Sequence, residues 1–499
     1  MKRDRWGNRA AFVLAAIGSA AGLGNAWRFP YVVYANGGGA FLIPYFVALL
    51  TAGIPLLVLE FSLGQKMQRG APAALAKVDR RFEGLGWWAV VTGTIITSYY
   101  AGVMAWVWDF IAGSFSAAWA EDAGAYFYNN VLQISDGPGQ LGGFSIPVLI
   151  GLILTWVAIY LILRNGAAGV GKVVMITVPL PVICLFILII RAITLPGAIA
   201  GINYFLEPDF SVIADPNVWI AAYGQVFFTL SLGFGIMIAY ASYMPEDSDI
   251  TNNALITVFA NSGISFLAGI AIFGTLGYMA QTQGVPISEV ATAGVGLAFV
   301  VYPNAIGMLP GGTAVAALFG IVFFTMLLTL GIDSAFSIVE AGVAAIKDKW
   351  GGTKRKVTFY YSLGLFIVGL LFATKAGLYW LDIVDHWVNT YGLIIAGFFE
   401  SIAIGWVYKP DKMRNYFNSV SEYRFGKWWN VMVKYVTPII LIILLYRKTL
   451  VDLGGYGGYA AKYIWYGGWI GVLGVLILSA IILPMAGGID VDEDISSKL

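Results

Sequence analysis

Long apolar segments recur along almost the whole chain and are separated by shorter polar connections. A helix needs about 20 apolar residues to cross the hydrocarbon core of a bilayer, and twelve segments come close to that length. They lie near residues 10–35, 40–62, 87–113, 144–163, 171–194, 216–243, 253–281, 311–346, 356–374, 378–407, 430–447 and 464–484. These runs are too long and too uninterrupted for barrel strands. Because backbone groups in lipid must be bonded within the chain, the pattern predicts an all-α integral membrane fold with twelve transmembrane helices.

Basic residues are spread unevenly over the connections between these segments. The connections 62–86, 347–356 and 408–434 hold five, five and six of them, and four more lie among the first nine residues. The connections 114–143 and 282–310 hold none. Since positive charge is retained on the cytoplasmic side, we expect a multi-pass protein of the cell (plasma) membrane with cytoplasmic N- and C-termini.

Composition agrees with a chain whose solvent is the lipid bilayer. Hydrophobic residues make up 59% of the 499 positions and charged residues 11%, whereas soluble proteins are about 25% charged. The 29 basic and 28 acidic residues leave a net charge of +1, which gives no indication of a nucleic-acid partner.

Single cysteine and histidine residues limit the chemistry that one chain can carry. Cys184 is the only cysteine, so an intrachain disulfide and a thiolate metal cluster are excluded. His386 is the only histidine, which excludes bis-histidine haem and argues against a histidine-based triad or metal site. With no nucleophile and base in a recognisable arrangement, an enzyme is the least favoured class.

Two glycine-rich interruptions occupy corresponding positions in the first and sixth apolar segments. Residues 18–24 hold one, and residues 230–235 hold the other, five spans later. Because five is odd, the two groups of five helices would run in opposite directions, which predicts a 5+5 inverted repeat with discontinuous helices 1 and 6, plus helices 11–12. Unwound backbone at that depth is tolerated where it lines a cavity. Close helix packing is the alternative interpretation of these glycines.

This interpretation divides the chain into five parts. They are a cytoplasmic N-terminal segment at 1–9, the first repeat with helices 1–5 at 10–200, the second repeat with helices 6–10 at 201–408, helices 11–12 at 409–485, and a cytoplasmic acidic tail at 486–499.

Four ordered motifs connect the chain to a known family. They are Asn-Ala-Trp-Arg-Phe-Pro at 25–30, Asn-Gly-Gly-Gly-Ala-Phe-Leu-Ile-Pro-Tyr at 36–45, Gln-Val-Phe-Phe-Thr-Leu-Ser-Leu-Gly-Phe-Gly at 225–235 and Gly-Ile-Asp-Ser-Ala-Phe at 331–336. In these the chain resembles the neurotransmitter:sodium symporter family, including the bacterial leucine transporter, with some animal-like features. The resemblance implies sodium-driven uptake of amino acids or related amines by alternating access.

Two sodium sites are implied by this resemblance. The first would use the Ala20 carbonyl with Asn25, Thr229 and Asn261, and the substrate carboxylate would complete it. The second would use the carbonyls of Gly18, Ala21 and Leu330 with the side chains of Asp333 and Ser334. Oxygen ligands suit a hard cation, and a broken helix frees carbonyls. A membrane-embedded acid such as Asp333 is a functional hypothesis by default; the alternative is that it caps or bridges helices.

A carboxylate-bearing substrate is indicated by the second half of the broken helix. Its N-terminus beside Leu23 and Gly24 offers free N–H groups and a positive dipole end. Monoamine carriers of the family place an aspartate where this chain has Gly22, so glycine favours a neutral amino acid. The resemblance implies a substrate site formed by Ser19, Ala20, Gly22, Leu23, Gly24, Ile96, Tyr100, Phe228, Thr229, Ser231, Phe234, Ser334 and Ile338.

Chloride dependence is a further expectation. Chloride-independent bacterial relatives carry an acidic residue where this chain has Ser265. The resemblance therefore implies a chloride site formed by Tyr45, Gln225, Thr229, Asn261 and Ser265. The alternative is that another acid, such as Glu60, supplies the negative charge.

Two charge pairs are candidate gates. By resemblance Arg28 pairs with Asp385 on the outer side, through water, and Arg3 pairs with Asp348 near Trp6 on the cytoplasmic side. Exposed ion pairs contribute about 0–1 kcal/mol, which suits contacts that must open. Plain membrane-surface charge is the alternative for Arg3.

Two other functions stay open at this point. One is a proton-coupled or otherwise coupled carrier of the same fold, which needs a titratable group in place of the sodium ligands. The other is a sodium-dependent ligand-binding receptor, which does not need two matched helix breaks. The sequence does not specify which amino acid is carried, and it leaves a homodimer open.

Overall fold

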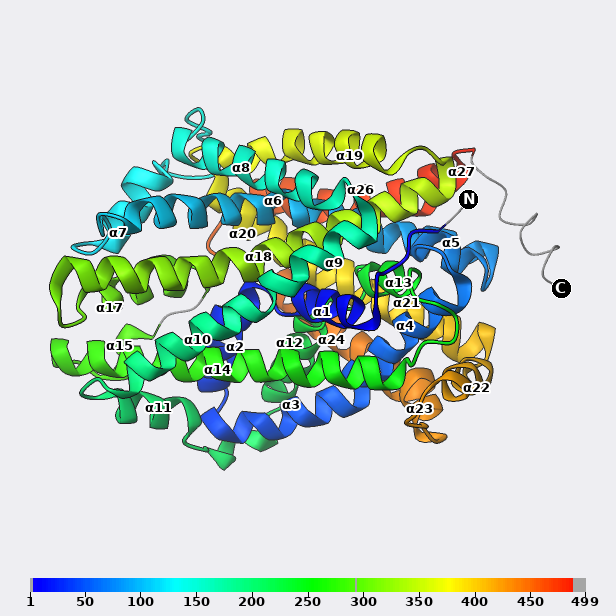
Figure 1. The fold of residues 1–499 in the computed structure, drawn as a ribbon, viewed down its shortest axis with the longest axis horizontal. Helices are drawn as coiled ribbons and strands as arrows, with labels where there is room; N and C mark the ends of the chain where they lie inside the picture. The colour runs from blue at the N-terminus through cyan, green and yellow to red at the C-terminus, as the bar shows by residue number, and fades with distance from the viewer. Residues whose placement is uncertain (1–2, 292–293, 488–499) are drawn as a thin grey trace.

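The computed structural model describes residues 3–291 and 294–487. This part of the chain is helical, with β structure confined in the described residues to one bridge between Phe144 and Thr374. Most long helices run along the longest axis of the molecule (Figure 1). The all-α prediction is confirmed. Of the expected acidic tail, residues 488–499 lie outside the described residues.

Helices of very different length follow one another along the chain. The α-helices of the first half are α1 (Arg9–Ala20), α2 (Leu23–Ala35), α3 (Leu42–Ala48), α4 (Ile54–Met67), α5 (Ala71–Ala76), α6 (Glu83–Ser114), α7 (Ala123–Ala125), α8 (Ile146–Leu163), α9 (Gly166–Thr177), α10 (Pro179–Ile193), α11 (Ala198–Leu206), α12 (Pro216–Thr229) and α13 (Ile236–Ala241). Those of the second half are α14 (Thr251–Gln283), α15 (Ile287–Val290), α16 (Gly294–Gly296), α17 (Tyr302–Gly307), α18 (Gly312–Trp350), α19 (Lys354–Gly369), α20 (Gly377–Trp387), α21 (Ile394–Ile402), α22 (Pro410–Val420), α23 (Trp428–Val431), α24 (Thr437–Asp452), α25 (Ala461–Ile464), α26 (Ile470–Ile477) and α27 (Leu483–Met485). Short 3₁₀ or π stretches extend or join them: η1 (Gly38–Phe41), η2 (Leu49–Gly53), η3 (Arg80–Phe82), η4 (Tyr126–Val131), η5 (Phe210–Ala214), η6 (Leu297–Val301), η7 (Leu370–Ala373), η8 (Val388–Leu393), η9 (Ala403–Tyr408), η10 (Met432–Val436), η11 (Trp465–Trp469) and η12 (Leu478–Ile482).

Ten continuous helical stretches in the described residues are long and apolar enough to cross a membrane. They are Gly38–Met67, Arg80–Ser114, Ile146–Leu163, Gly166–Ile193, Thr251–Gln283, Gly312–Trp350, Lys354–Ala373, Gly377–Tyr408, Trp428–Asp452 and Ala461–Met485. The pair α1 and α2 makes an eleventh if it is one span, bent by 52° at its break. Each of the eleven overlaps one apolar segment expected from the sequence.

The remaining expected segment, residues 216–243, is not a continuous helix. It forms α12 and the six-residue α13, with a non-helical break over residues 230–235 between them. Neither α12 nor α13 is long enough to count as a membrane span. The described residues therefore contain ten spans, or eleven with the bent pair α1 and α2, where twelve were expected. The shortfall arises at the second glycine-rich interruption.

Burial separates central from peripheral spans. In the span that contains α6, 83% of the most apolar 18-residue stretch is buried inside the protein. In the last span, Ala461–Met485, only 17% of the corresponding stretch is buried. Helix α6 packs along α18 and also contacts α8 and α5. The last span therefore exposes most of its apolar surface to lipid, and α6 and α18 form the interior that the site uses.

The two ends of the bundle differ. At the end that carries the N-terminus lie α5, α22 and α23 (Figure 1), which belong to two of the basic connections. We call this the N-terminal end. At the opposite end, which we call the far end, lie α7, α11 and α17 (Figure 1).

Candidate ion and substrate site

The first helix break lies between α1 and α2. Helix α1 ends at Ala20, and the next residue, Ala21, leaves helical geometry with ψ of 83°. Gly22 is extended, with φ of −105° and ψ of −167°, and caps α2. The interruption expected over residues 18–24 is thus confined to two residues.

Glycines around this break allow close approach rather than unusual backbone angles. A Cβ on Gly22 would lie 2.7 Å from Ser334 Oγ, and one on Gly24 would lie 2.8 Å from the Phe228 ring. A Cβ on Gly18 would lie 2.7 Å from Asp333 Oδ2. Side chains of other spans therefore press against the backbone of the break.

The second break has a different local cause. Between α12 and α13, Ser231, Gly233 and Gly235 have positive φ values of 54°, 77° and 72°. Left-handed geometry is easy for glycine and costs roughly 1–2 kcal/mol at an L residue. The carboxylate of Glu60, from α4, accepts a hydrogen bond from the Gly233 N–H at 2.8 Å, which satisfies one donor that the break exposes.

Hydroxyl groups join the two breaks. The Ser231 hydroxyl donates to the Ser19 carbonyl at 2.9 Å, and the Ser334 hydroxyl of α18 donates to the same carbonyl at 3.2 Å. The Ser19 hydroxyl bonds that of Ser337 at 2.8 Å. The C-terminal end of α1 is therefore held by both the second break and α18.

A cavity of about 500 Å³ lies where the breaks meet. Ligand cavities typically measure about 300–1,000 Å³. All thirteen residues predicted to bind the substrate line it: Ser19, Ala20, Gly22, Leu23, Gly24, Ile96, Tyr100, Phe228, Thr229, Ser231, Phe234, Ser334 and Ile338. The lining continues to Asp382, His386 and Lys448, so the cavity extends to the far end.

Neutral oxygens cluster beside this cavity. The hydroxyl of Thr229 lies 3.5 Å from Asn25 Oδ1 and 3.4 Å from Asn261 Oδ1. The Asn25 amide donates to Asn261 Oδ1 and to Ser265 Oγ, both at 2.7 Å. All four residues are buried. The structure thus brings together the three side chains predicted for the first sodium site, and two amide oxygens and a hydroxyl are a donor set that fits sodium.

Asp333 lies beside the end of α1. It is 1% exposed, and it accepts a hydrogen bond from the Thr177 hydroxyl at 2.7 Å. No ion pair to it occurs among the described residues. A buried carboxylate without a cation partner costs free energy. Together with its contact at Gly18 and with Ser334 next in sequence, this arrangement fits the second predicted sodium site.

The predicted chloride residues are only partly brought together by direct bonds. Ser265 contacts Asn25 and donates to the Asn261 carbonyl at 3.2 Å. Tyr45 bonds Ser262, at 3.0 Å, rather than Ser265. Gln225 is 1% exposed, and neither polar atom of its side chain has a hydrogen-bond partner among the described residues.

The predicted cytoplasmic gate residues meet at the N-terminal end. The Arg3 guanidinium bonds Asp348 and lies 5.0 Å over the Tyr243 ring. The Trp6 indole donates to the Tyr240 carbonyl at 2.8 Å. None of the three predicted gate residues lines the cavity. The lining of the cavity therefore does not reach this packed N-terminal end.

The predicted outer pair is apart. Arg28 lies 4.5 Å over the ring of Phe228, and no ion pair joins it to Asp385 in the described chain. Asp385 instead accepts hydrogen bonds from Tyr99 at 2.6 Å and Asn389 at 2.5 Å. Both Arg28 and Asp385 line the cavity, so they flank its far end without closing it.

Six side chains that sequence reasoning passed over bond directly to predicted site residues. They are Thr177 to Asp333, Ser337 to Ser19, Tyr99 and Asn389 to Asp385, Ser262 to Tyr45, and Ser242 to Arg3. Ser337 and Asn389 lie three and four residues after Ser334 and Asp385, so helical spacing could have indicated them. No sequence signal singles out Thr177.

Comparisons with known proteins agree with this arrangement. The family model described as sodium:neurotransmitter symporter family matches residues 3–124 and 119–491. An uncharacterized sodium-dependent transporter of Methanocaldococcus jannaschii is 45% identical over 97% of this chain and 96% of its own length. The sodium- and chloride-dependent GABA transporter 2 of Bos taurus is 35% identical over 96% of this chain and 85% of its own. The corresponding taurine transporter of Canis lupus familiaris is 34% identical over 88% and 77%. With matches along nearly its whole length, this multi-pass membrane protein belongs to the sodium:neurotransmitter symporter family, a family of sodium-dependent transporters rather than enzymes.

Proposed function

We propose that this chain is a sodium-coupled, chloride-dependent symporter that imports a neutral amino acid by alternating access. The observation that carries the proposal is that two helix breaks, from α1–α2 and α12–α13, meet at one cavity beside two sets of buried oxygen ligands. Breaks of this kind supply carbonyls to cations and N–H groups to anions.

Sodium binds at two sites in this proposal. At the first, Asn25, Thr229 and Asn261 supply side-chain oxygens and Ala20 its carbonyl. At the second, Asp333 and Ser334 act with the carbonyls of Gly18, Ala21 and Leu330. The neutral first set needs one more oxygen, and the substrate carboxylate supplies it, so ion and substrate bind together. A proton-coupled carrier would need a titratable group at the first set, where all three side chains are neutral.

The substrate carboxylate lies at the N-terminus of α2. The Leu23 N–H points to the Tyr100 hydroxyl at 3.2 Å, so this tyrosine can relay a hydrogen bond to the anion. A side chain at Gly22 would meet Ser334 and Tyr100. Because no acid is present there to pair with an amine, a substrate that brings its own carboxylate is favoured. Ile96, Phe234 and Ile338 favour an apolar side chain.

A second substrate class is favoured by the relatives. The GABA and taurine transporters align with most of this chain, and both names denote amino acids whose amine and acid are separated by more than one carbon. The same anion site would hold the carboxylate of GABA or the sulfonate of taurine, with the amine placed further along the cavity. A panel of radiolabelled substrates separates the two classes.

Chloride binds, in this proposal, among Tyr45, Gln225, Thr229, Asn261 and Ser265. Support comes from the buried Gln225, whose amide has no partner among the described residues, and from the neutral Ser265 beside Asn25. An anion there offsets the sodium charge. The alternative source of charge, Glu60, already bonds the second break.

The topology follows from the same proposal. Counting α12 and α13 as one discontinuous span makes twelve, and helices 1–5 and 6–10 form an inverted repeat. The basic connections lie at the N-terminal end, which places that end and both termini in the cytoplasm of a plasma-membrane protein. The closed N-terminal end and the extension of the cavity to the far end then correspond to an outward-facing state. Arg28 and Asp385 close the outer side, through water, once substrate is bound.

Uptake into proteoliposomes tests the proposal. Radiolabelled amino acids are presented to the purified protein under an inward sodium gradient, and accumulation above equilibrium is expected for a neutral amino acid. Replacing sodium by choline should abolish it, and replacing chloride by gluconate should reduce it strongly. Accumulation driven equally well by a proton gradient in choline would refute sodium coupling. Sodium-dependent binding without accumulation would identify a receptor instead.

A further inference from the structure

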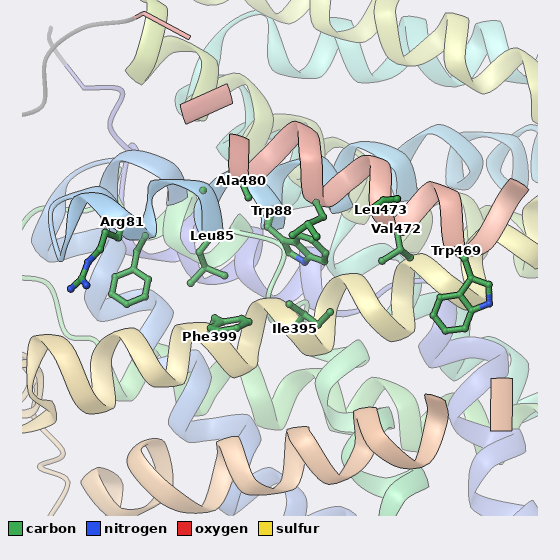
Figure 2. A pocket seen from close by; sticks show the side chains of 12 residues that line it. Arg81, Leu85, Trp88, Ile395, Phe399, Trp469, Val472, Leu473 and Ala480 are labelled. Carbon is green, nitrogen blue, oxygen red and sulfur yellow. The ribbon is translucent and has the colours of Figure 1, made fainter. Parts of the chain in front are cut away.

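An apolar groove lies on the outside of the bundle, away from the substrate cavity. Its volume is about 580 Å³. Figure 2 shows that the last span forms one wall and α21 the other, with Trp88 of α6 between them. Trp88 is 5% exposed and its indole N–H donates to the Gly392 carbonyl at 2.7 Å. The polar edge of this ring is thus satisfied, and its apolar face is left for the groove.

The groove is open to the bilayer. Phe399 of one wall is 44% exposed, and Leu473 and Leu476 of the other are 52% and 45% exposed. Where the last span approaches α6, a Cβ on Gly84 would lie 3.1 Å from the Ala480 Cα, so the two helices touch and seal that side. The open part of the groove, which we call the slot, is in a membrane accessible only to lipid.

Length and charge identify the occupant. The last span lines the slot from Trp469 to Ala480, a rise of eleven residues, which at 1.5 Å each is about 16 Å. One leaflet is about 15 Å deep, half of the ~30 Å hydrocarbon core. Among the described residues that line the slot, Arg81 is the charged one, and it lies at the end opposite Trp469 (Figure 2).

The guanidinium of Arg81 has donors to spare. Its Nε and Nη2 donate to Asp79 at 3.0 and 2.8 Å, which uses two of five N–H groups. Its side chain is 80% exposed. Asp79 holds the guanidinium in place, and the remaining N–H groups can donate to a phosphate oxygen, a pairing that arginine geometry suits.

We propose that this slot binds one anionic phospholipid, with an acyl chain between the last span and α21 and its phosphate on Arg81. The lipid then supports α21 from outside. On its other side α21 meets the second helix break, since a Cβ on Gly233 would lie 2.9 Å from the Leu393 carbonyl oxygen and 3.2 Å from the Ala396 Cβ. Lipid in the slot therefore stabilises one wall of the transport site.

Native mass spectrometry of the delipidated full chain tests this assignment. After addition of phosphatidylglycerol, the parent protein should retain one tightly held lipid. Leu473→Trp, which fills the slot, should lose most of it. Ile470→Trp, on the same helix with 49% exposure and outside the lining, should keep it. Leu476→Trp, with Ile477→Trp as its control, repeats the comparison if the first variant does not fold.

The headgroup is tested separately. Arg81→Gln should bind phosphatidylglycerol and phosphatidylcholine equally, whereas Arg355→Gln, at another exposed arginine, should keep the preference. Equal lipid retention by parent, Leu473→Trp and Leu476→Trp would overturn the proposal. Stabilisation of the protein by inorganic phosphate alone would also overturn it. A change from dimer to monomer in Leu473→Trp with no loss of lipid would overturn it as well, and would assign the slot to a second copy of the chain.

Discussion

Asp333→Asn is the sharpest test of the ion site, because it removes one charge and keeps nearly the same shape. The carboxylate is 1% exposed and accepts one hydrogen bond, from Thr177. Two opposite unit charges about 4 Å apart attract by about 4 kcal/mol at an effective dielectric constant of about 20. Since about 1.4 kcal/mol corresponds to a factor of ten, sodium affinity at this site should fall by about two to three orders of magnitude.

The effect on stability should have the opposite sign. Without sodium, the parent protein buries a carboxylate with no cation partner, so Asp333→Asn should be at least as stable as the parent. With sodium, only the parent should gain stability. Melting temperature measured over a sodium titration, with choline as the replacement cation, reports both effects.

A matched control uses a buried acid outside the sodium ligands. Asp452 is 3% exposed and bonds His386 and Tyr391, both at 2.8 Å. Asp452→Asn should lower the melting temperature at every sodium concentration and leave the sodium response intact. If Asp333→Asn behaved in that way, Asp333 would be a helix tether and the ion-site assignment would be wrong.

Three further predictions concern chloride, substrate and gating. Ser265→Asp should make uptake independent of chloride, because a fixed charge replaces the anion; uptake in gluconate measures this. Tyr100→Phe should weaken substrate binding by about 0.5–1.5 kcal/mol, or up to about tenfold, since one hydrogen bond beside Leu23 is lost; a binding assay in saturating sodium shows whether affinity changes. Arg3→Ala should release Asp348 and favour the inward-facing state, so that accumulation falls while equilibrium binding in detergent persists; unchanged accumulation would leave Arg3 as surface charge.

Much of the fold follows from hydrophobic length alone. Ten of the expected apolar segments appear as continuous spans, and an eleventh as the bent pair α1 and α2, because about 20 apolar residues have few alternatives in lipid. The sixth segment does not follow from length alone, since residues 230–235 adopt left-handed angles at Ser231, Gly233 and Gly235, and there the glycine-rich pattern was the signal that indicated a break.

The site was predictable where the family resemblance names the residues and not where a partner in another span decides the contact. Neutral oxygens at Asn25, Thr229 and Asn261 were expected together, and they meet. The bond from Thr177 to Asp333 joins residues 156 positions apart, and a threonine in an apolar segment gives no sign of it. The separation of Arg28 from Asp385 is likewise decided by other partners, since Arg28 lies over the Phe228 ring while Tyr99 and Asn389 bond the Asp385 carboxylate.

The two glycine-rich interruptions look alike in sequence but differ physically, and paired substitutions can show the difference. At Gly24 the obstacle is a side chain, because a Cβ would lie 2.8 Å from the Phe228 ring. At Gly235 the obstacle is the backbone, with φ of 72°, as well as the Ala71 side chain at 2.9 Å.

Gly24→Ala should therefore destabilise the protein by about 1–3 kcal/mol through overpacking, and adding Phe228→Leu should recover much of the loss. Gly235→Ala should keep a penalty of roughly 1–2 kcal/mol even when Ala71→Gly removes the side-chain contact. Thermal unfolding of the single and double variants compares the two cycles. Full recovery in both would mean that close packing alone explains both motifs, and that the second break does not need its left-handed geometry.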